Sequence, residues 1–217
     1  MSAVSPYNYI CIEGNIGAGK TTFCKMLNEE FNCQLILEQF AENPFLPFFY
    51  KDPERYAFPV ELFFMTERYK QLENYILNMD MFHEFHVADY FFVKTLLFAG
   101  RTLSEHEFKL FQSFYEILDT KFPNPDIVVY LHRSVPRLLA QIINRGRSYE
   151  MDISREYLQS IQDAYFDYFK SEVSYPVLVI DIETMDFQRD KKQYELLKQI
   201  IFKPYQPGLH RISLFGN

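Results

Sequence analysis

The stretch Gly14-Asn15-Ile16-Gly17-Ala18-Gly19-Lys20-Thr21 decides the fold of this chain. It satisfies the pattern G-x-x-x-x-G-K-[ST], and it lies between an apolar, strand-forming run at residues 7–12 and a helical pattern at residues 21–31. A turn nearly free of Cβ atoms lets backbone N–H groups converge on phosphate oxygens, and the helix start adds partial positive charge. The order of strand, loop and helix therefore predicts a P-loop that binds a nucleoside triphosphate, the alternative being a glycine-rich turn of structural use only.

The side chains that end this loop have distinct predicted roles. Lys20 is predicted to bridge the β- and γ-phosphates, and the Thr21 hydroxyl is predicted to ligate Mg²⁺. The residues predicted to hold the triphosphate are Gly14, Asn15, Ile16, Gly17, Ala18, Gly19, Lys20, Thr21 and Thr22. The P-loop leaves the reaction open, because GTPases, motors and small-molecule kinases share it.

Strand-like and helix-like patterns alternate along the rest of the chain. Further strands are expected at residues 35–37, 126–131 and 177–180, and the last two are largely β-branched, as in buried parallel strands. Helices are expected at residues 53–79, 90–99, 104–121, 135–144, 153–170 and 191–202. This alternation predicts an α/β fold with three layers, α/β/α, around a five-stranded parallel sheet. We expect a single domain over residues 1–217 with an irregular tail at residues 204–217.

Charge and composition exclude several other classes of protein. With 22 Lys and Arg against 29 Asp and Glu, the net charge of −7 argues against broad binding to a nucleic acid polymer. Apolar runs end well before the ~18 residues of a membrane span, and no basic segment followed by an apolar stretch opens the chain, so a cytoplasmic location without membrane contact is expected. The chain has three cysteines, Cys11, Cys24 and Cys33, without a C-x-x-C pair or a metal-binding spacing to histidines. Neither a disulfide framework nor a zinc site is therefore indicated.

Several motifs together resemble the deoxynucleoside kinase family. They are the P-loop with Thr22, Glu38 after the second expected strand, residues 50–68, residues 145–150, and Asp186-Phe187. The resemblance implies a P-loop kinase that transfers the γ-phosphate of ATP to the 5′-hydroxyl of a deoxyribonucleoside, with Mg²⁺ and as a homodimer. Two rivals stay open: a nucleoside monophosphate kinase of the thymidylate kinase kind, and a nucleotide-binding switch that is not a kinase.

The resemblance also implies roles for residues on the acceptor side. Glu38 follows a strand whose carboxyl end faces the ligand crevice of an open α/β sheet, and it is assigned the role of general base. The alternative for Glu38 is a surface carboxylate that caps the next segment. Tyr50 matches the family's tyrosine on the sugar 3′-hydroxyl, Glu150 matches the acidic partner of that hydroxyl, and Arg68 matches an arginine near the base.

Two positions depart from the family pattern where the nucleobase is read. Glu61 falls on the family's Gln, and Lys94 falls on its Asp. A carboxylate only accepts hydrogen bonds, and guanine offers two adjacent donors, while Lys94 would donate to O6 or N7, so a purine, deoxyguanosine or deoxyadenosine, is weakly preferred. Alternatively, Glu61 and Lys94 pair with each other or lie outside the pocket.

A third departure concerns Asp89 and its neighbour Tyr90. Relatives carry Glu-Arg-Ser or Asp-Arg-Ser here, so Asp89 is either the acid associated with Mg²⁺ or the residue at the arginine position. If Tyr90 replaces that arginine, the cation that helps to hold Glu38 and the phosphates must come from elsewhere, such as Arg68 or the lid.

An arginine-rich lid is expected at residues 145–151. Arg145 and Arg147 flank a glycine, and they are predicted to close over the triphosphate and offset charge on the γ-phosphoryl group. A solvated basic cluster at a helix end is the alternative. Asp186 and Phe187 resemble the loop that, in the deoxynucleoside kinase family, holds the base of the triphosphate. An ordinary turn is the alternative for these two residues.

Overall fold

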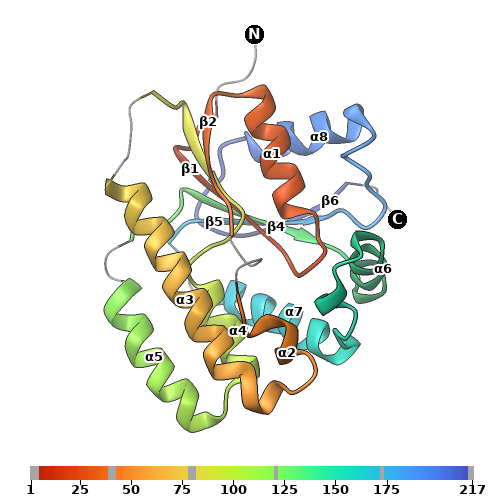
Figure 1. Ribbon diagram of the computed structural model, residues 1–217. Helices are drawn as coiled ribbons and strands as arrows, with labels where there is room; N and C mark the ends of the chain where they lie inside the picture. Colours follow the sequence, from red (N-terminus) through yellow and green to blue (C-terminus); the bar gives the residue numbers. More distant parts are fainter. Residues whose placement is uncertain (1–4, 39–42, 78–81, 120–121, 172–173, 215–217) are drawn as a thin grey trace.

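A computed structural model describes residues 5–38, 43–77, 82–119, 122–171 and 174–214. Within these residues one parallel sheet has the strand order β2-β3-β1-β4-β5-β6 (Figure 1). The strands are β1 (Tyr9–Glu13), β2 (Cys33–Ile36), β3 (Phe85–Ala88), β4 (Ile127–His132), β5 (Pro176–Asp181) and β6 (Gly208–Ser213). The predicted three-layer α/β fold is confirmed, with six strands rather than five.

Strands β3 and β6 are absent from the predicted set for physical reasons. β3 has four residues and places His86 among apolar neighbours, so its pattern is too short to stand out. β6 is an edge strand whose residues are exposed or half-buried and include His210 and Arg211. The prediction of an irregular tail is therefore wrong for residues 208–213, which pair in parallel with β5.

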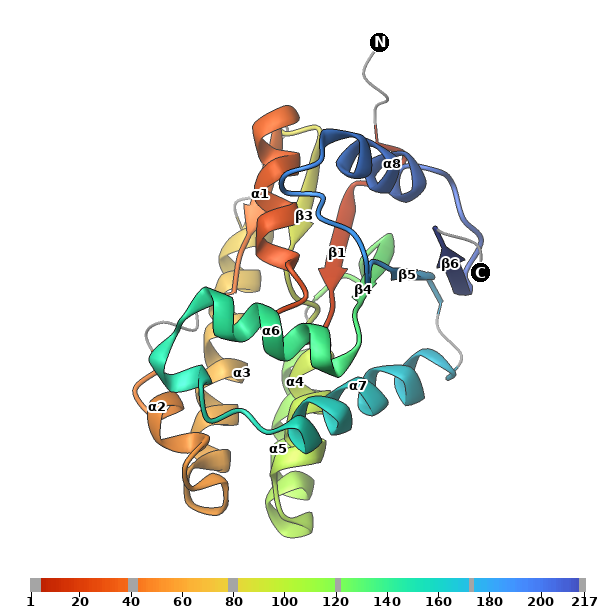
Figure 2. The same cartoon turned by 90° about the vertical axis from the view of Figure 1, so that its right-hand side faces the viewer.

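Helices cover both faces of the sheet, as Figures 1 and 2 show. Alternate residues of β1 divide between two cores, with Ile10 and Ile12 on one face and Tyr9 and Cys11 on the other. The first face is covered by α1 (Lys20–Glu30), α6 (Val135–Arg145) and α8 (Lys191–Ile201). The second face is covered by α3 (Pro53–Leu77), α4 (Lys94–Thr102), α5 (Glu105–Asp119) and α7 (Arg155–Phe169).

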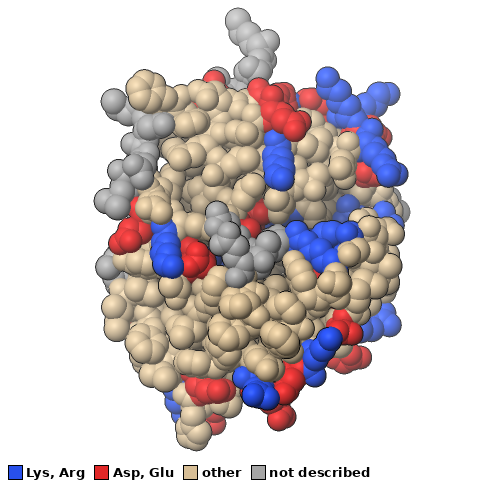
Figure 3. Space-filling model, in the orientation of Figure 1, with Lys and Arg blue, Asp and Glu red and all other residues tan. Residues whose placement is uncertain are grey.

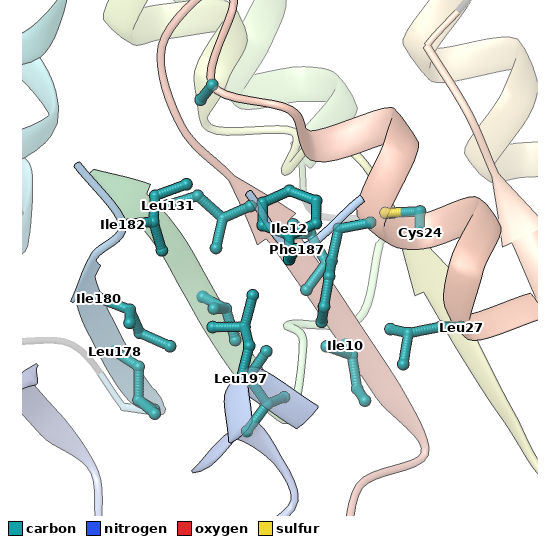
Figure 4. Packing of buried hydrophobic residues seen from close by; sticks show 14 of the residues in the cluster. Ile10, Ile12, Cys24, Leu27, Leu131, Leu178, Ile180, Ile182, Phe187 and Leu197 are labelled. Carbon is teal, nitrogen blue, oxygen red and sulfur yellow. The ribbon is translucent and has the colours of Figure 1, made fainter. Parts of the chain in front are cut away.

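The first core anchors the helix that follows the P-loop. Figure 4 shows Cys24 and Leu27 of α1 and Leu197 of α8 packed against strand residues such as Ile10 and Ile12. All five side chains are fully buried. Burial of this face sets the position and direction of α1, and therefore the direction in which its first backbone N–H groups point.

Helix ends lie close to their predicted positions, with one useful exception. Ser134 and Ser154 cap α6 and α7 by accepting hydrogen bonds from the backbone of Arg137 and Tyr157. The helix expected at residues 90–99 instead begins at Lys94, because residues 91–94 first form a turn. The predicted ends of the helices at 53–79 and 104–121 fall outside the described residues.

The topology predicts that ligands bind at the carboxyl ends of the strands. β2 and β3 lie on one side of β1, and β4, β5 and β6 lie on the other. The order in which strands are added to the sheet therefore reverses beside β1, and this is the switch point of the sheet. Ligands of open α/β sheets bind at such a switch point. In the part of the chain that the structure describes, no helix is both long enough and apolar enough to cross a bilayer.

Candidate active site

The P-loop lies at the carboxyl end of β1 and leads directly into α1. Gly17 and Gly19 have φ angles of +85° and +99°, in the left-handed region that favours glycine. A Cβ at Gly14 would lie 2.8 Å from the carbonyl oxygen of Leu131, so the loop passes too close to β4 for a side chain there. The glycines of the motif are therefore required by geometry.

Two polar side chains hold the loop in shape. The side-chain amide of Asn15 donates to the carbonyl oxygen of Leu158 in α7 at 2.7 Å, and its oxygen accepts from the backbone of Ile16 at 2.8 Å. Lys20 Nζ donates to the carbonyl oxygens of Gly14 at 2.8 Å and of Asn15 at 3.1 Å. Burial, with a further contribution from the nearby Lys94 charge, lowers the pKa of Lys20 to about 8.

Asp89 connects the P-loop to the predicted general base. It follows β3 directly; one carboxylate oxygen accepts from the Thr21 hydroxyl, and the other accepts from the backbone N–H of Glu38 at 2.7 Å. Burial raises the pKa of Asp89, and the Glu38 charge raises it further. Of the two registers left open by the sequence, this arrangement matches the acid beside the predicted metal ligand Thr21.

Glu38 lies between two cations from different helices. Arg68 of α3 donates from Nε to Glu38 Oε1 at 2.8 Å and also from Nη2, and Lys94 of α4 donates to Oε2 at 2.6 Å. The side chains of Arg68 and Lys94 are 4% and 6% exposed, so these ion pairs are buried. Despite the opposing effect of burial, the two cations lower the pKa of Glu38 to about 2. The structure thus directs Lys94 to Glu38, and two cations stand where the family pattern expects one arginine.

One pocket brings the predicted acceptor residues together with the P-loop. It is lined by Gly17, Gly19, Lys20, Thr21, Thr22, Glu38, Tyr50, Glu61, Arg68, Asp89, Lys94, Arg145, Arg147 and Glu150. Glu61, which is 2% exposed, accepts a hydrogen bond from the Thr102 hydroxyl at 3.0 Å. Burial raises the pKa of Glu61 to about 7, against a lowering effect of Arg68.

Aromatic side chains also line this pocket. Tyr50 follows α2 (Leu46–Phe49) and meets the ring of Tyr157 edge-on, with the centroids 6.1 Å apart. Burial raises the pKa of Tyr50, and the negative charges of Glu150 and Glu61 raise it further, so this hydroxyl is protonated. Tyr50, Glu61 and Glu150 therefore surround one space next to Glu38.

The predicted lid residues form an ion-pair cluster at the pocket mouth. Arg145 Nε donates to Glu150 Oε2 at 3.0 Å, and Arg147 Nη1 donates to Glu150 Oε1 at 3.2 Å. Gly146, with a φ of +69°, ends α6 between them, and Glu150 belongs to the short helix η1 (Ser148–Glu150). Figure 3 shows Lys and Arg side chains gathered in the middle of this face, on the side where α6 lies in Figure 1.

A second pocket lies on the other side of the P-loop. Its lining includes Gly17, Ala18, Gly19 and Thr22, together with Arg133, Arg137, Asp186 and Phe187. The backbone N–H of Asp186 donates to Gln193 Oε1 at 2.6 Å. The ring of Phe187 is buried in the first core (Figure 4) and meets Phe23 edge-on. It also packs against Gly19, where a Cβ would lie 3.1 Å from the Phe187 ring.

Two buried charged residues of the site were missing from the sequence-based set. Glu13 ends β1 and accepts hydrogen bonds from Phe91 N at 2.6 Å and the Tyr165 hydroxyl at 2.8 Å. Arg133 follows β4 and donates to the carbonyl oxygen of Met185 at 2.9 Å, which holds the loop before Phe187. Each charge lies at the carboxyl end of a buried strand, and that position is the signal that could have identified them.

Comparison with known proteins identifies the family of this chain. The family model described as deoxynucleoside kinase matches residues 10–203. The deoxyguanosine kinase of Bacillus subtilis is 36% identical over 191 residues, covering 86% of this chain and 92% of that protein. The deoxyadenosine/deoxycytidine kinase of the same organism is 28% identical over 195 residues, covering 86% and 88%.

Solved structures show the same similarity. A structure of deoxyadenosine kinase from M. mycoides with dCMP and dCDP bound has a TM-score of 0.74 and 26% identity to this chain, covering 88% of this chain and 97% of that one. Another structure of that kinase, with dATP bound, has a TM-score of 0.73. With the family model matching almost the whole chain, this protein belongs to the deoxynucleoside kinase family and is an enzyme that phosphorylates a deoxynucleoside.

Proposed function

We propose that this enzyme transfers the γ-phosphate of ATP to the 5′-hydroxyl of a purine deoxynucleoside, with deoxyguanosine preferred. The observation that carries the proposal is the series of contacts Thr21–Asp89–Glu38, which joins the phosphate-binding loop to a carboxylate that lines the acceptor pocket. A donor phosphate at the P-loop and an acceptor hydroxyl at Glu38 would share one space. That is the geometry an in-line phosphoryl transfer requires.

On the donor side, the protein groups match the charge of a triphosphate with its metal ion. The loop amides and Lys20 would bind the β- and γ-phosphates, and Arg145 and Arg147 would approach from the lid. The Thr21 hydroxyl and the Asp89 carboxylate are hard oxygen donors of the kind Mg²⁺ prefers, and would hold it together with phosphate oxygens and water. Bound there, Mg²⁺ would neutralise charge on the phosphates.

The base of ATP would occupy the second pocket, between α6 and the loop that contains Asp186 and Phe187. Arg133 secures this loop through two of its carbonyl oxygens, those of Glu183 and Met185. Because the Phe187 ring is buried, contacts to the donor base would come from the main chain of the loop and from Asp186.

On the acceptor side, Glu38 would accept the hydrogen bond of the 5′-hydroxyl and orient it. Tyr50 and Glu150 would bind the 3′-hydroxyl, and the packed ring of Tyr50 against Tyr157 leaves little room for a 2′-hydroxyl. Glu150 also pairs with Arg145 and Arg147. A sugar bound to Glu150 would therefore alter the ion pairs that position the lid.

Deoxyguanosine is preferred because of Glu61. As a carboxylate it accepts hydrogen bonds, and guanine presents two adjacent donors, N1–H and the 2-amino group. The Thr102 hydroxyl already occupies Oε1, which orients the carboxylate within the pocket. Lys94 is engaged with Glu38, so base recognition is assigned to Glu61 and not to Lys94.

The reaction is tested by incubating the protein with ATP and each of the four deoxynucleosides, or each deoxynucleoside monophosphate, and quantifying products. We expect 5′-monophosphates from deoxynucleosides, with deoxyguanosine fastest. Turnover of monophosphates alone would indicate a thymidylate-like kinase. ATP hydrolysis that is independent of nucleoside and yields no phosphorylated nucleoside would indicate a nucleotide-binding switch.

Replacing Glu61 by Gln should reduce kcat/KM for deoxyguanosine by about 10- to 100-fold, because hydrogen bonds to a charged group contribute about 1.5–3 kcal/mol. Deoxyadenosine should lose less, since Gln can both accept from its 6-amino group and donate to N1. Rates for all four nucleosides in both proteins provide the measurement. An unchanged base ranking in the variant would rule out Glu61 as the base-reading residue.

Base preference should also depend on pH through Glu61. Its pKa is raised by burial to about 7, in surroundings that include Arg68, Lys94, Glu38, Tyr50 and Tyr157. Above this pKa the carboxylate accepts from guanine, and below it the acid can donate to N1 of adenine. The deoxyguanosine to deoxyadenosine ratio of kcat/KM should therefore fall by up to about 100-fold between pH 8 and pH 6, and be flat in Glu61→Gln.

We also propose a homodimer that uses α5 and the neighbouring part of α3. Leu110 and Phe114, one helical turn apart on α5, are 52% and 45% exposed, and Leu62 on α3 is 36% exposed. The neighbouring helix α4 packs between α3 and α7. The outer helix α5 is therefore the better candidate.

Phe114→Asp is expected to convert a dimer into a monomer, because it places a charge within an apolar contact. Sedimentation velocity at matched concentrations measures the change. Ser113→Asp, which adds the same charge at the neighbouring exposed position, is the control. A wild-type protein that sediments as a monomer would contradict the proposal.

A further inference from the structure

Lys94 is buried at the start of α4, where none of the roles above requires a second cation. The residue is 4% exposed, and its ammonium donates to Glu38 Oε2 at 2.6 Å. A buried ammonium is costly unless it is paired, and replacing such an ion pair by apolar residues is often neutral for stability. Stability alone therefore gives a weak reason for Lys94 to be there.

The hydrogen bonds at Glu38 show where the acceptor hydroxyl would bind. Each carboxylate oxygen accepts about two hydrogen bonds. Oε1 receives two, from Nε and Nη2 of Arg68, whereas Oε2 receives the one from Lys94. Among the described residues, the remaining acceptor position is thus on Oε2, and a hydroxyl bound there lies next to the Lys94 ammonium.

The charges around Lys94 reach to the phosphate side as well. Its positive charge adds to the effect of burial in lowering the pKa of Lys20. Burial raises the pKa of Glu13, which ends β1 immediately before the P-loop, and the Lys94 charge partly offsets that rise. Lys20, Arg68 and Lys94 line the same pocket as the carboxylates Glu38 and Asp89, so Lys94 shares one space with the acceptor carboxylate and the P-loop lysine.

We propose that Lys94 is a catalytic residue whose ammonium contacts the 5′-oxygen and the phosphoryl group during transfer. This inference rests on the proposed kinase reaction. The bond between the 5′-oxygen and the γ-phosphorus forms, the bond from that phosphorus to the β,γ-bridging oxygen breaks, and ADP leaves. The hydroxyl proton passes to Glu38 Oε2 and then to water, while Lys94 keeps its protons and donates hydrogen bonds throughout.

The test compares Lys94→Met and Lys94→Arg with the wild-type enzyme, using ATP and deoxyguanosine. Loss of one donor to a transition state lowers kcat by about 10²- to 10³-fold. We expect a fall of that size for Lys94→Met, a KM for deoxyguanosine within about threefold of wild type, and an unchanged base ranking. Lys94→Arg, which keeps the charge and the donors, should recover at least part of kcat.

Chemical rescue separates a catalytic ammonium from a structural one. Lys94→Ala leaves a cavity beside Glu38, and added ethylamine should restore kcat in a saturable manner. A matched control is Lys198→Met, because Lys198 is also a buried lysine paired with a carboxylate, Glu30, but lies on α8 outside both pockets. Lys198→Met should lower the melting temperature without changing kcat.

Each other outcome has a distinct meaning. A change of base ranking with kcat retained in Lys94→Met would show that Lys94 reads the base and would overturn the proposal. A loss that neither arginine nor ethylamine restores, in proteins that melt at the wild-type temperature, would also overturn it. If the wild-type enzyme phosphorylates no deoxynucleoside, the proposed function fails before the role of Lys94 is reached.

Discussion

Replacing Glu38 by Gln is expected to lower kcat for deoxynucleoside phosphorylation by about 10²- to 10⁴-fold, the range for loss of a positioned acid–base group. Gln presents one oxygen and one N–H₂ group, so it cannot accept from Arg68, Lys94 and the 5′-hydroxyl at once. The hydroxyl loses its orienting partner, and two buried cations lose their counter-charge. Initial rates at saturating ATP and deoxynucleoside measure the effect.

The pKa of Glu38, lowered to about 2 by Lys94 and Arg68, bears on what this carboxylate does. Such a group is a weak base, and a loose phosphoryl-transfer transition state needs little deprotonation of the nucleophile. We therefore expect orientation to account for most of the loss in Glu38→Gln. Glu38→Asp, which keeps the charge but shortens the side chain, should consequently be almost as damaging.

A carboxylate remote from the pocket supplies the control for Glu38→Gln. Glu30 on α1 also pairs with a buried lysine, Lys198, although its side chain is 34% exposed against 10% for Glu38. Glu30→Gln should leave kcat unchanged. If Glu38→Gln retained kcat within about threefold while binding deoxynucleoside normally, Glu38 would not be the acceptor-side residue.

The fold could be predicted to the extent that buried strands are continuous and apolar. β1, β4 and β5 are buried on both faces apart from their ends, and such runs are visible without any partner. β6 has one edge without a neighbouring strand within the described sheet, and two consecutive polar residues, His210 and Arg211, separate Leu209 from Ile212, as in a surface segment. These residues form a strand because they pair with β5, and the sequence of residues 208–213 alone does not predict that pairing.

The site could be predicted where chemistry is encoded locally. The P-loop is a contiguous motif, and its glycines are required by contacts that the motif itself implies, such as the approach of Gly14 to β4. The partners of Glu38 are not contiguous, since Arg68 and Lys94 lie 30 and 56 residues away along the chain. Position in a family pattern suggested that Lys94 reads the base, and only the packing of α4 against α3 directs it to Glu38.

Lys20→Met is expected to lower kcat/KM for ATP on the order of 10³-fold, since it removes a charge-assisted donor that acts on phosphates in both the ground and transition states. Lys20 now donates to the carbonyl oxygens of Gly14 and Asn15, two groups of its own loop. These bonds keep the ammonium beside the position where phosphates would bind, so little rearrangement precedes ATP binding. Steady-state kinetics with varied ATP measure the effect.

Stability should respond differently from activity in Lys20→Met. Burial lowers the pKa of Lys20 to about 8, which shows that the protein desolvates this charge at a cost. Met removes that cost together with two hydrogen bonds, so the melting temperature should change little. Lys25→Met, at an exposed position of the same helix, should alter neither activity nor melting. A Lys20→Met enzyme with wild-type kcat/KM for ATP would show that the triphosphate binds elsewhere, and the functions assigned to Thr21, Asp89 and the lid would fail with it.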